Sequence, residues 1–233
     1  MTRENGDGGK KSAAKRNPFV QKVKEGDQQK ERVKPSFSIE DKDEANLNAS
    51  QRKLIEDIRA ALDQDDKDRV LKLVNVLQTS NEWPDGIPKS IKMAALDALG
   101  WYGSSCLPEI IGFLADVDPE LVAKATEKFQ EALSDPELTD RELAAILIQA
   151  SKVVTDTDMM DMMLFEMNRM RHSVAVETMK ALMASDSETV KSVLPDNIQF
   201  YTGEEGIATP EQLDEWLKEY PDDENDEEFF GKR

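Results

Sequence analysis

Hydrophobic residues between positions 91 and 133 recur with the period of an α-helix, and they do so twice. The first stripe follows an i, i+3, i+4, i+7, i+8 pattern and consists of Ile91, Ala94, Ala95, Ala98 and Leu99. The second consists of Val122, Ala125, Phe129, Ala132 and Leu133. The alanines allow a neighbouring helix to approach closely. Ala125 follows Ala95 by 30 residues, which predicts related helices in a repeated unit.

Turn-forming residues separate the two stripes. Gly100 and Gly103 are predicted to end the first helix. Ser104 and Ser105 are suited to cap the next helix, and Pro108 suits its first turn. The pattern therefore predicts a helical hairpin.

Two Asp-Pro-Glu sequences, at 118–120 and 135–137, each predict a further helix start, with an aspartate cap and proline at the first helical position. Similar amphipathic patterns precede residue 91 and follow residue 137. The expected elements are a helix from Ser50, a second after Asp66, a long turn at 81–88, helical pairs at 89–115, 119–154 and 157–184, a short helix at 188–194 and a last helix starting at Thr209.

The segment 91–136 resembles the HEAT-like helical repeats, especially the short bacterial type also seen in phycobilin lyase-like proteins. The matching residues are Ile91-Lys92, Ala94, Ala95, Ala98-Leu99-Gly100, Gly103, Pro108 and Leu121-Val122. The chain departs from the pattern at Val122, where a basic residue is usual. The resemblance implies an all-α fold, a right-handed α-solenoid of about four hairpins, and a scaffold or adaptor role. It does not imply lyase activity, because no residues that carry such activity can be placed here.

Charge is unevenly distributed along the 233 residues. Residues 1–35 hold ten basic and five acidic residues, whereas the remainder holds 20 basic and 43 acidic residues. We therefore expect a disordered basic arm at 1–45, a solenoid at 46–200, a short C-terminal helix at 201–220 and a disordered acidic tail at 221–233. An acidic body repels phosphate backbones, so a basic or amphipathic helical segment of a protein is the expected partner, rather than duplex nucleic acid.

Composition gives little support for catalysis or for a membrane span. Cys106 is the only cysteine, which fits a reducing compartment and a cytoplasmic location. No stretch reaches the roughly 18 apolar residues that a spanning helix needs. His172 is the only histidine and is interpreted as a helix-start residue. Asp156, Asp158 and Asp161 resemble the start of a calcium loop without its glycine and distal glutamate, so we expect no metal and no cofactor.

Methionines are concentrated in one part of the chain. Eight of the ten lie between Met159 and Met183. Methionine side chains adapt to irregular apolar ligands, so this cluster is either a partner-binding groove or a loosely specified core. Helical spacing alone produces the same pattern, which favours the core.

Three functions remain open. The first and favoured one is a non-catalytic adaptor that binds a protein partner. The second is a tethering or RNA-associated protein that uses its basic arm, and the third is a HEAT-type lyase-like enzyme. For the adaptor, the predicted partner-binding residues are Lys72, Asn75, Glu109, Phe113, Gln149, Lys152, Met163, Met167, Met170 and Lys180.

Overall fold

The computed structural model describes residues 34–84 and 86–222, and the regular secondary structure of these residues is entirely helical. The expected all-α class is therefore confirmed for this part of the chain. The α-helices are α1 (Asp41–Ala45), α2 (Ala49–Asp63), α3 (Lys67–Thr79), α4 (Lys89–Tyr102), α5 (Leu107–Ile111), α6 (Pro119–Leu133), α7 (Asp140–Ala150), α8 (Thr157–Phe165), α9 (His172–Met183), α10 (Glu188–Thr202) and α11 (Pro210–Glu219). Two 3₁₀ helices, η1 (Gly103–Cys106) and η2 (Glu166–Arg169), precede α5 and α9.

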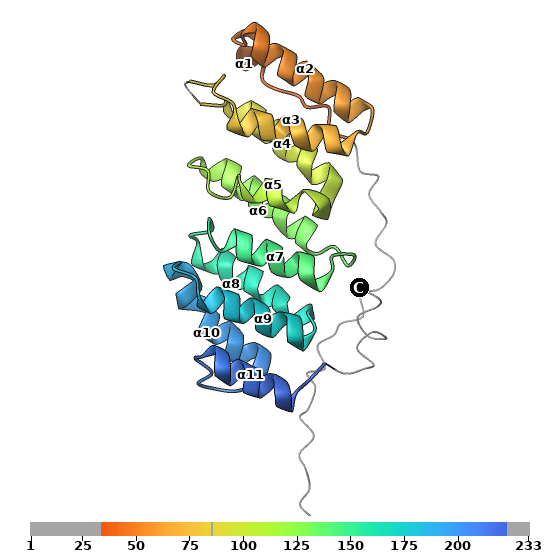
Figure 1. The fold of residues 1–233 in the computed structure, drawn as a ribbon. Helices are drawn as coiled ribbons and strands as arrows, with labels where there is room; N and C mark the ends of the chain where they lie inside the picture. Colours follow the sequence, from red (N-terminus) through yellow and green to blue (C-terminus); the bar gives the residue numbers. More distant parts are fainter. Residues whose placement is uncertain (1–33, 85, 223–233) are drawn as a thin grey trace, which may run out of the picture. The chain divides into compact units, whose positions relative to one another are not determined.

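Packing between the helices is local along the chain (Figure 1). The main helix–helix packings each join a helix to one no more than two helices away. α5, α7, α9 and α11 pack in series, while α4 packs on α6 and α8 packs on α10. The chain thus alternates between two rows of helices, and successive helical pairs bury a continuous set of apolar side chains.

α4 packs on α6, and both helices carry buried alanines. Ala95 and Ala125 are both fully buried. Gly100 lies so close to α6 that a Cβ there would be 2.6 Å from the side chain of Lys128. Small residues at these positions let the two helices approach closely, as the 30-residue offset predicts.

Polar contacts between successive units recur at a similar sequence separation. The Nε of Arg171 donates to the Asp140 carboxylate at 3.0 Å, across 31 residues. The Tyr201 hydroxyl donates to the carbonyl of Met170 at 3.2 Å, also across 31 residues. Ser104 and Asp135 are likewise 31 residues apart. The separation is close to the length of one helical pair.

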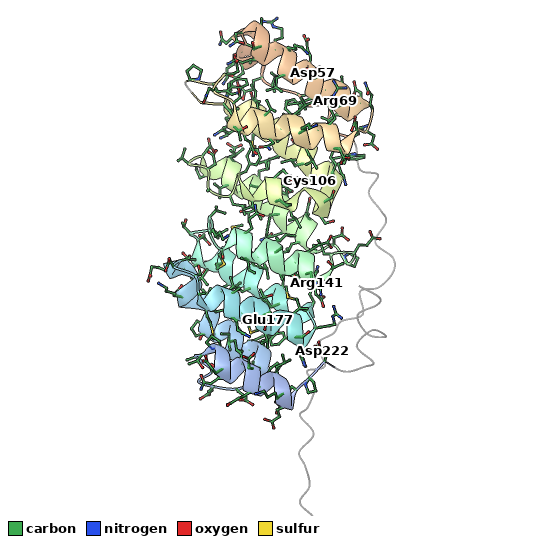
Figure 2. All side chains as sticks on the ribbon, viewed as in Figure 1. Asp57, Arg69, Cys106, Arg141, Glu177 and Asp222 are labelled. Carbon is green, nitrogen blue, oxygen red and sulfur yellow. The ribbon has the colours of Figure 1, made fainter. Side chains whose placement is uncertain are left out.

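The chain that follows α11 returns to the N-terminal end of α9. The backbone N–H of Ser173 donates to Asp222 at 3.0 Å, and the Ser173 hydroxyl donates to the second oxygen of the same carboxylate. Nδ1 of His172 lies 3.0 Å from the carbonyl of Tyr220. The ring of Tyr220 stacks on that of Trp216. We refer to residues 220–222 as the C-terminal strap; Asp222 is labelled in Figure 2.

Three expected boundaries differ from the structure. Residues 34–45 were expected to be disordered, but Phe37 is buried and α1 occupies Asp41–Ala45. The helix expected at 188–194 continues through Pro195 to Thr202, because burial of Val190, Val193, Leu194 and Ile198 outweighs the cost of an internal proline. The pair α10 and α11 therefore extends the helical stack beyond residue 200. Residues 1–33 and 223–233 of the expected arm and tail lie outside the described residues.

Three expected helix-end signals are also corrected. α4 continues through Gly100 and ends at Gly103, whose φ of 64° favours glycine. Neither Ser104 nor Ser105 caps α5, because both lie within η1. The expected start at Asp135 is a turn, and α7 begins instead after Thr139, which forms a capping box with Glu142.

Candidate partner-binding surface

Four of the predicted partner-binding residues lie exposed along one row of helices. Lys72 and Asn75 are on α3, Gln149 is on α7, and Lys152 is in the turn that follows α7. Neither Lys72 nor Lys152 forms an ion pair with another described residue. Their side chains are therefore available to a partner without loss of an internal contact.

Glu109 and Lys180 are half-buried. Lys180 pairs with Glu177 at 2.8 Å and with Asp214 at 3.0 Å, so it connects α9 to α11. Both pairings raise the pKa of the Lys180 ammonium. One carboxylate oxygen of Glu109 is buried without a hydrogen-bond partner among the described residues. The Lys180 side chain is thus committed to the fold rather than free for a ligand.

Four of the predicted binding residues are buried, which for Phe113 contradicts its expected exposure and for the three methionines contradicts a binding groove. Met163, Met167 and Met170 are each at most 2% exposed and belong to the apolar core. Phe113 is 4% exposed, because α5 ends at Ile111 and the following turn directs this ring inward. Of the two interpretations of the methionine cluster, these three residues match the core and not a groove.

A groove between η1, α5 and α7 is the feature on this row that sequence analysis missed. Its volume is about 380 Å³, and its lining residues are Ser104, Ser105, Pro108, Glu137, Leu138, Glu142, Ala145, Ile146 and Gln149. The floor is apolar: Leu138 and Ile146 are each 6% exposed. Ser105 and Ala145 are small, so neither fills the space above the floor.

Both charged residues in the lining of the groove are acidic. Hydrogen bonds from the hydroxyl and backbone N–H of Thr139 lower the pKa of Glu142 below its usual value. Glu137 is exposed and carries its charge into solvent. The amide nitrogen of Gln149 donates to the carbonyl of Pro108 at 3.3 Å, which holds α7 to the start of α5. No basic residue lines the groove.

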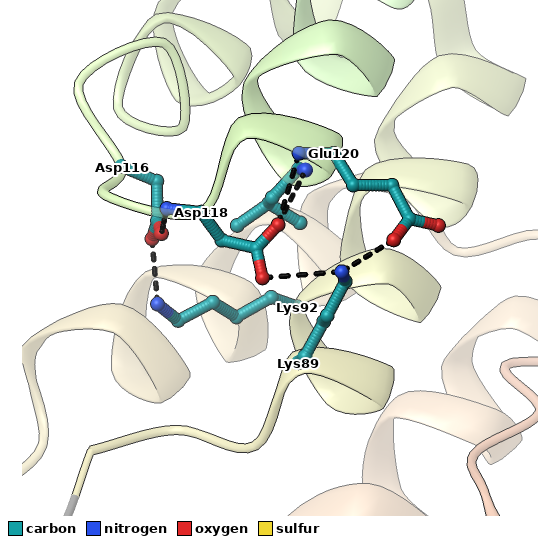
Figure 3. Close-up of polar contacts among 6 residues, drawn as sticks. Lys89, Lys92, Asp116, Asp118 and Glu120 are labelled. Carbon is teal, nitrogen blue, oxygen red and sulfur yellow. Dashed lines mark hydrogen bonds and ion pairs between the residues drawn. The ribbon is translucent and has the colours of Figure 1, made fainter.

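A cluster of charged residues joins α4 to the start of α6, the helix on which α5 packs (Figure 3). Lys89 at the start of α4 lies 3.1 Å from Asp118 and also contacts Glu120, while Lys92 pairs with Asp116. The hydrogen bond from Lys89 lowers the pKa of Asp118. Asp118 also accepts from the backbone N–H groups of Glu120 and Leu121, which caps α6 as the sequence predicts.

The described residues include no arrangement typical of catalysis. Cys106 is buried, and burial raises the pKa of its thiol to about 11, so little of it is the nucleophilic thiolate near neutral pH. His172 is the first residue of α9, as expected, and its ring packs edge-on against Trp216 and Tyr201. Asp156 caps α8 by accepting from the backbone N–H of Met159. Within residues 34–84 and 86–222, no three or more His, Cys, Asp or Glu side chains are grouped to hold a metal ion.

None of the described helices has the length and apolarity required to cross a membrane. Comparison of the chain with protein-family models, with curated proteins and with solved structures found no match. The geometry of the described residues is therefore the basis for a functional proposal.

Proposed function

We propose that this chain is a non-catalytic helical-repeat scaffold that binds a protein partner along the row formed by α3, α5, α7 and α9. In this proposal the helical pairs form a right-handed α-solenoid of the HEAT-like kind. Two observations support such an arrangement: the main packings are confined to helices close in the chain, and polar contacts recur about 31 residues apart.

The exposed side chains of this row are the observation on which the binding proposal rests. Lys72, Asn75 and Lys152 occupy helical or turn positions without an ion pair to another described residue. By contrast, Lys124 on α6 is held in an ion pair with Asp97 of α4, and Lys180 within the row is held by Asp214 of α11. A row that combines unpaired polar residues with a partly apolar groove suits recognition of another protein.

The partner is proposed to be basic or amphipathic. Residues 34–222 contain 38 acidic and 19 basic residues, so the body attracts positively charged segments and repels nucleic-acid backbones. A cytoplasmic location is part of the proposal because Cys106 is the only cysteine. The alternative, RNA binding by the basic arm, depends on residues outside the described ranges.

A pull-down from native lysate with mass spectrometry tests the scaffold. The test variant is Asn75→Arg on α3, which adds positive charge to the proposed surface, and the control is Gln199→Arg, which makes the same change at an exposed position of α10. We expect the wild type and the control to retain a discrete protein that the test variant loses. A partner retained equally by all three would contradict this binding surface, and recovery of nucleic acid would favour the arm.

A version trimmed to 34–222 separates the body from the termini. A cut at 46–200 would remove Phe37 from the core and all of α11, so the longer boundaries are required. We expect the trimmed body to retain the partner. Retention only by the full chain would move the binding function to the terminal segments.

A further inference from the structure

The groove lined by η1, α5 and α7 combines an apolar floor with an acidic rim. We propose that it binds an extended peptide segment of the partner in which an apolar side chain lies next to a lysine or arginine. This inference rests on the proposed scaffold function and assigns the site and the chemical class of ligand.

The apolar floor provides the anchor position. Leu138 and Ile146 are mostly buried, and the small exposed part of each side chain forms the floor of the groove. Pro108 and Ala145 also line it. A volume of about 380 Å³ lies at the lower end of the range of ligand pockets. It therefore suits one or two apolar side chains rather than a large cofactor. Burial of an aliphatic side chain at such a site contributes favourably to binding in proportion to the apolar area covered.

The acidic rim gives the preference for a basic neighbour. Glu137 is exposed, and both hydrogen bonds from Thr139 to Glu142 use Oε2, which leaves Oε1 of Glu142 available. With no basic residue in the lining, an anionic ligand would be repelled, whereas lysine or arginine next to the anchor would meet a carboxylate. Charge complementarity thus favours those peptides that carry a lysine or arginine next to the apolar residue.

Two polar groups are placed to hold a peptide backbone. The Gln149 side chain donates from its amide nitrogen to Pro108, so its Oε1 is oriented away from that bond and can accept a peptide N–H. The Ser105 hydroxyl donates to the carbonyl of Tyr102 at 3.0 Å and retains acceptor capacity. These acceptors, one on η1 and one on α7, suit an extended chain lying between α5 and α7.

The test uses the full chain and a phage-displayed library of random 12-residue peptides, followed by fluorescence anisotropy with the selected peptides. We expect enrichment of sequences with Lys or Arg beside Leu, Ile, Met or Phe. Ala145→Arg, which fills the groove and adds positive charge, should weaken binding at least tenfold. Glu137→Lys should weaken it about threefold to tenfold and reduce its dependence on salt.

Matched controls separate the groove from general effects. Ala123→Arg on α6 and Glu56→Lys on α2 make the same changes at exposed positions outside the groove, and should bind the peptides as the wild type does. Circular dichroism melts of all four variants establish that each is folded. Glu137→Lys keeps the test decisive if Ala145→Arg fails to fold, because Glu137 is exposed and its side chain supports no helix.

Several outcomes would overturn the inference. Selected peptides that bind Ala145→Arg and wild type equally would place the binding site elsewhere, and enrichment of acidic peptides or of none would refute the ligand class. Self-association abolished by Ala145→Arg would identify a second copy of the chain as the occupant. The lysate experiment distinguishes the scaffold proposal from this one. A partner that is lost by Asn75→Arg but kept by Ala145→Arg would support the scaffold and refute the groove as the binding site.

Discussion

The α4–α6 packing and the methionine-rich region around α8 and α9 reach similar burial by different means. α4 and α6 together bury five alanines, and charged pairs such as Lys92 with Asp116 lie at the edge. Around α8 and α9 the core contains Met160, Met163 and other methionines. The first region depends on short side chains that set the distance between helices, whereas the second depends on flexible side chains that fill the available space.

This difference predicts different sensitivities to volume. Atoms added at the fully buried alanines of α4 and α6 must displace neighbouring helices, because these positions leave no space for a larger side chain. Added or rearranged atoms among the methionines can be accommodated by changes of rotamer.

The largest expected loss of stability comes from truncating Phe129, the largest side chain in the second stripe. Phe129 is fully buried on α6, between alanines that cannot fill the space it leaves. Phe129→Ala should lower the free energy of unfolding by about 3–5 kcal/mol, through lost apolar burial and a residual cavity. Urea denaturation followed by circular dichroism measures it. A loss below about 1 kcal/mol would show that the α4–α6 packing collapses easily, against our description of it.

A smaller loss is expected when a side chain is enlarged in the same packing. Ala95 is fully buried on α4, which packs on α3, α5 and α6, so Ala95→Leu must displace a neighbouring helix. We expect a destabilisation of about 1–3 kcal/mol. The same denaturation experiment measures it, with Ala123→Leu on the exposed side of α6 as the control. An unchanged midpoint for Ala95→Leu would remove the contrast between the two regions.

A still smaller loss is expected in the methionine-rich region. Met160 is fully buried on α8. Met160→Leu keeps the side-chain volume nearly constant, and its neighbours are themselves adaptable, so the loss should be less than about 1.5 kcal/mol. It should also be less than the loss for Ala95→Leu. The reverse order of the two variants would refute the comparison.

The smallest effect concerns pH at the edge of the α4–α6 packing. Partial burial alone would raise the pKa of Asp116, but hydrogen bonds from Lys92 and from the backbone of Asp118 and Val117 lower it. A folded-state pKa below the unfolded value means that this carboxylate stabilises the fold above the unfolded pKa of about 4. That contribution is lost as the pH falls through the folded-state pKa.

The variant Asp116→Asn isolates this contribution. Its urea midpoint should fall less than that of the wild type when the pH is lowered from about 6 to about 3, because the variant has no such carboxylate to protonate. Parallel curves for the two proteins would show that the Lys92 pair has no effect on stability.

The features that sequence analysis predicted correctly are those set by neighbouring residues. The cap at Asp118 and the capping box at Thr209 depend on side chains two or three positions from the backbone groups they bind. The stripes of α4 and α6 depend on helical period, and their predicted residues are buried except Val122, where Leu121 is buried instead. Such signals are fully contained in a short stretch of sequence.

The features that it missed depend on residues that are distant in sequence. The groove places Ser105 and Pro108 next to Ile146 and Gln149, which are about 40 residues away in the chain. No local sequence pattern indicates that these residues are close in the structure. Phe113 was expected to be exposed because a longer α5 was assumed. Pro195 indicated a helix end, and only contacts of α10 with α8 and α9 explain why the helix continues. Tertiary packing overrode local preference at these positions.

The C-terminal strap has a consequence for how the molecule opens. In a protein whose packing is local, the last unit is free to fray before the others unfold. Here the links from His172 to Tyr220 and from Ser173 to Asp222 span 48 and 49 residues, so they enclose α9, α10 and α11 within one loop of chain. Detachment of α11 must therefore uncap α9 at the same time. The strap joins the final helices into one cooperative block, which opens as a whole rather than helix by helix.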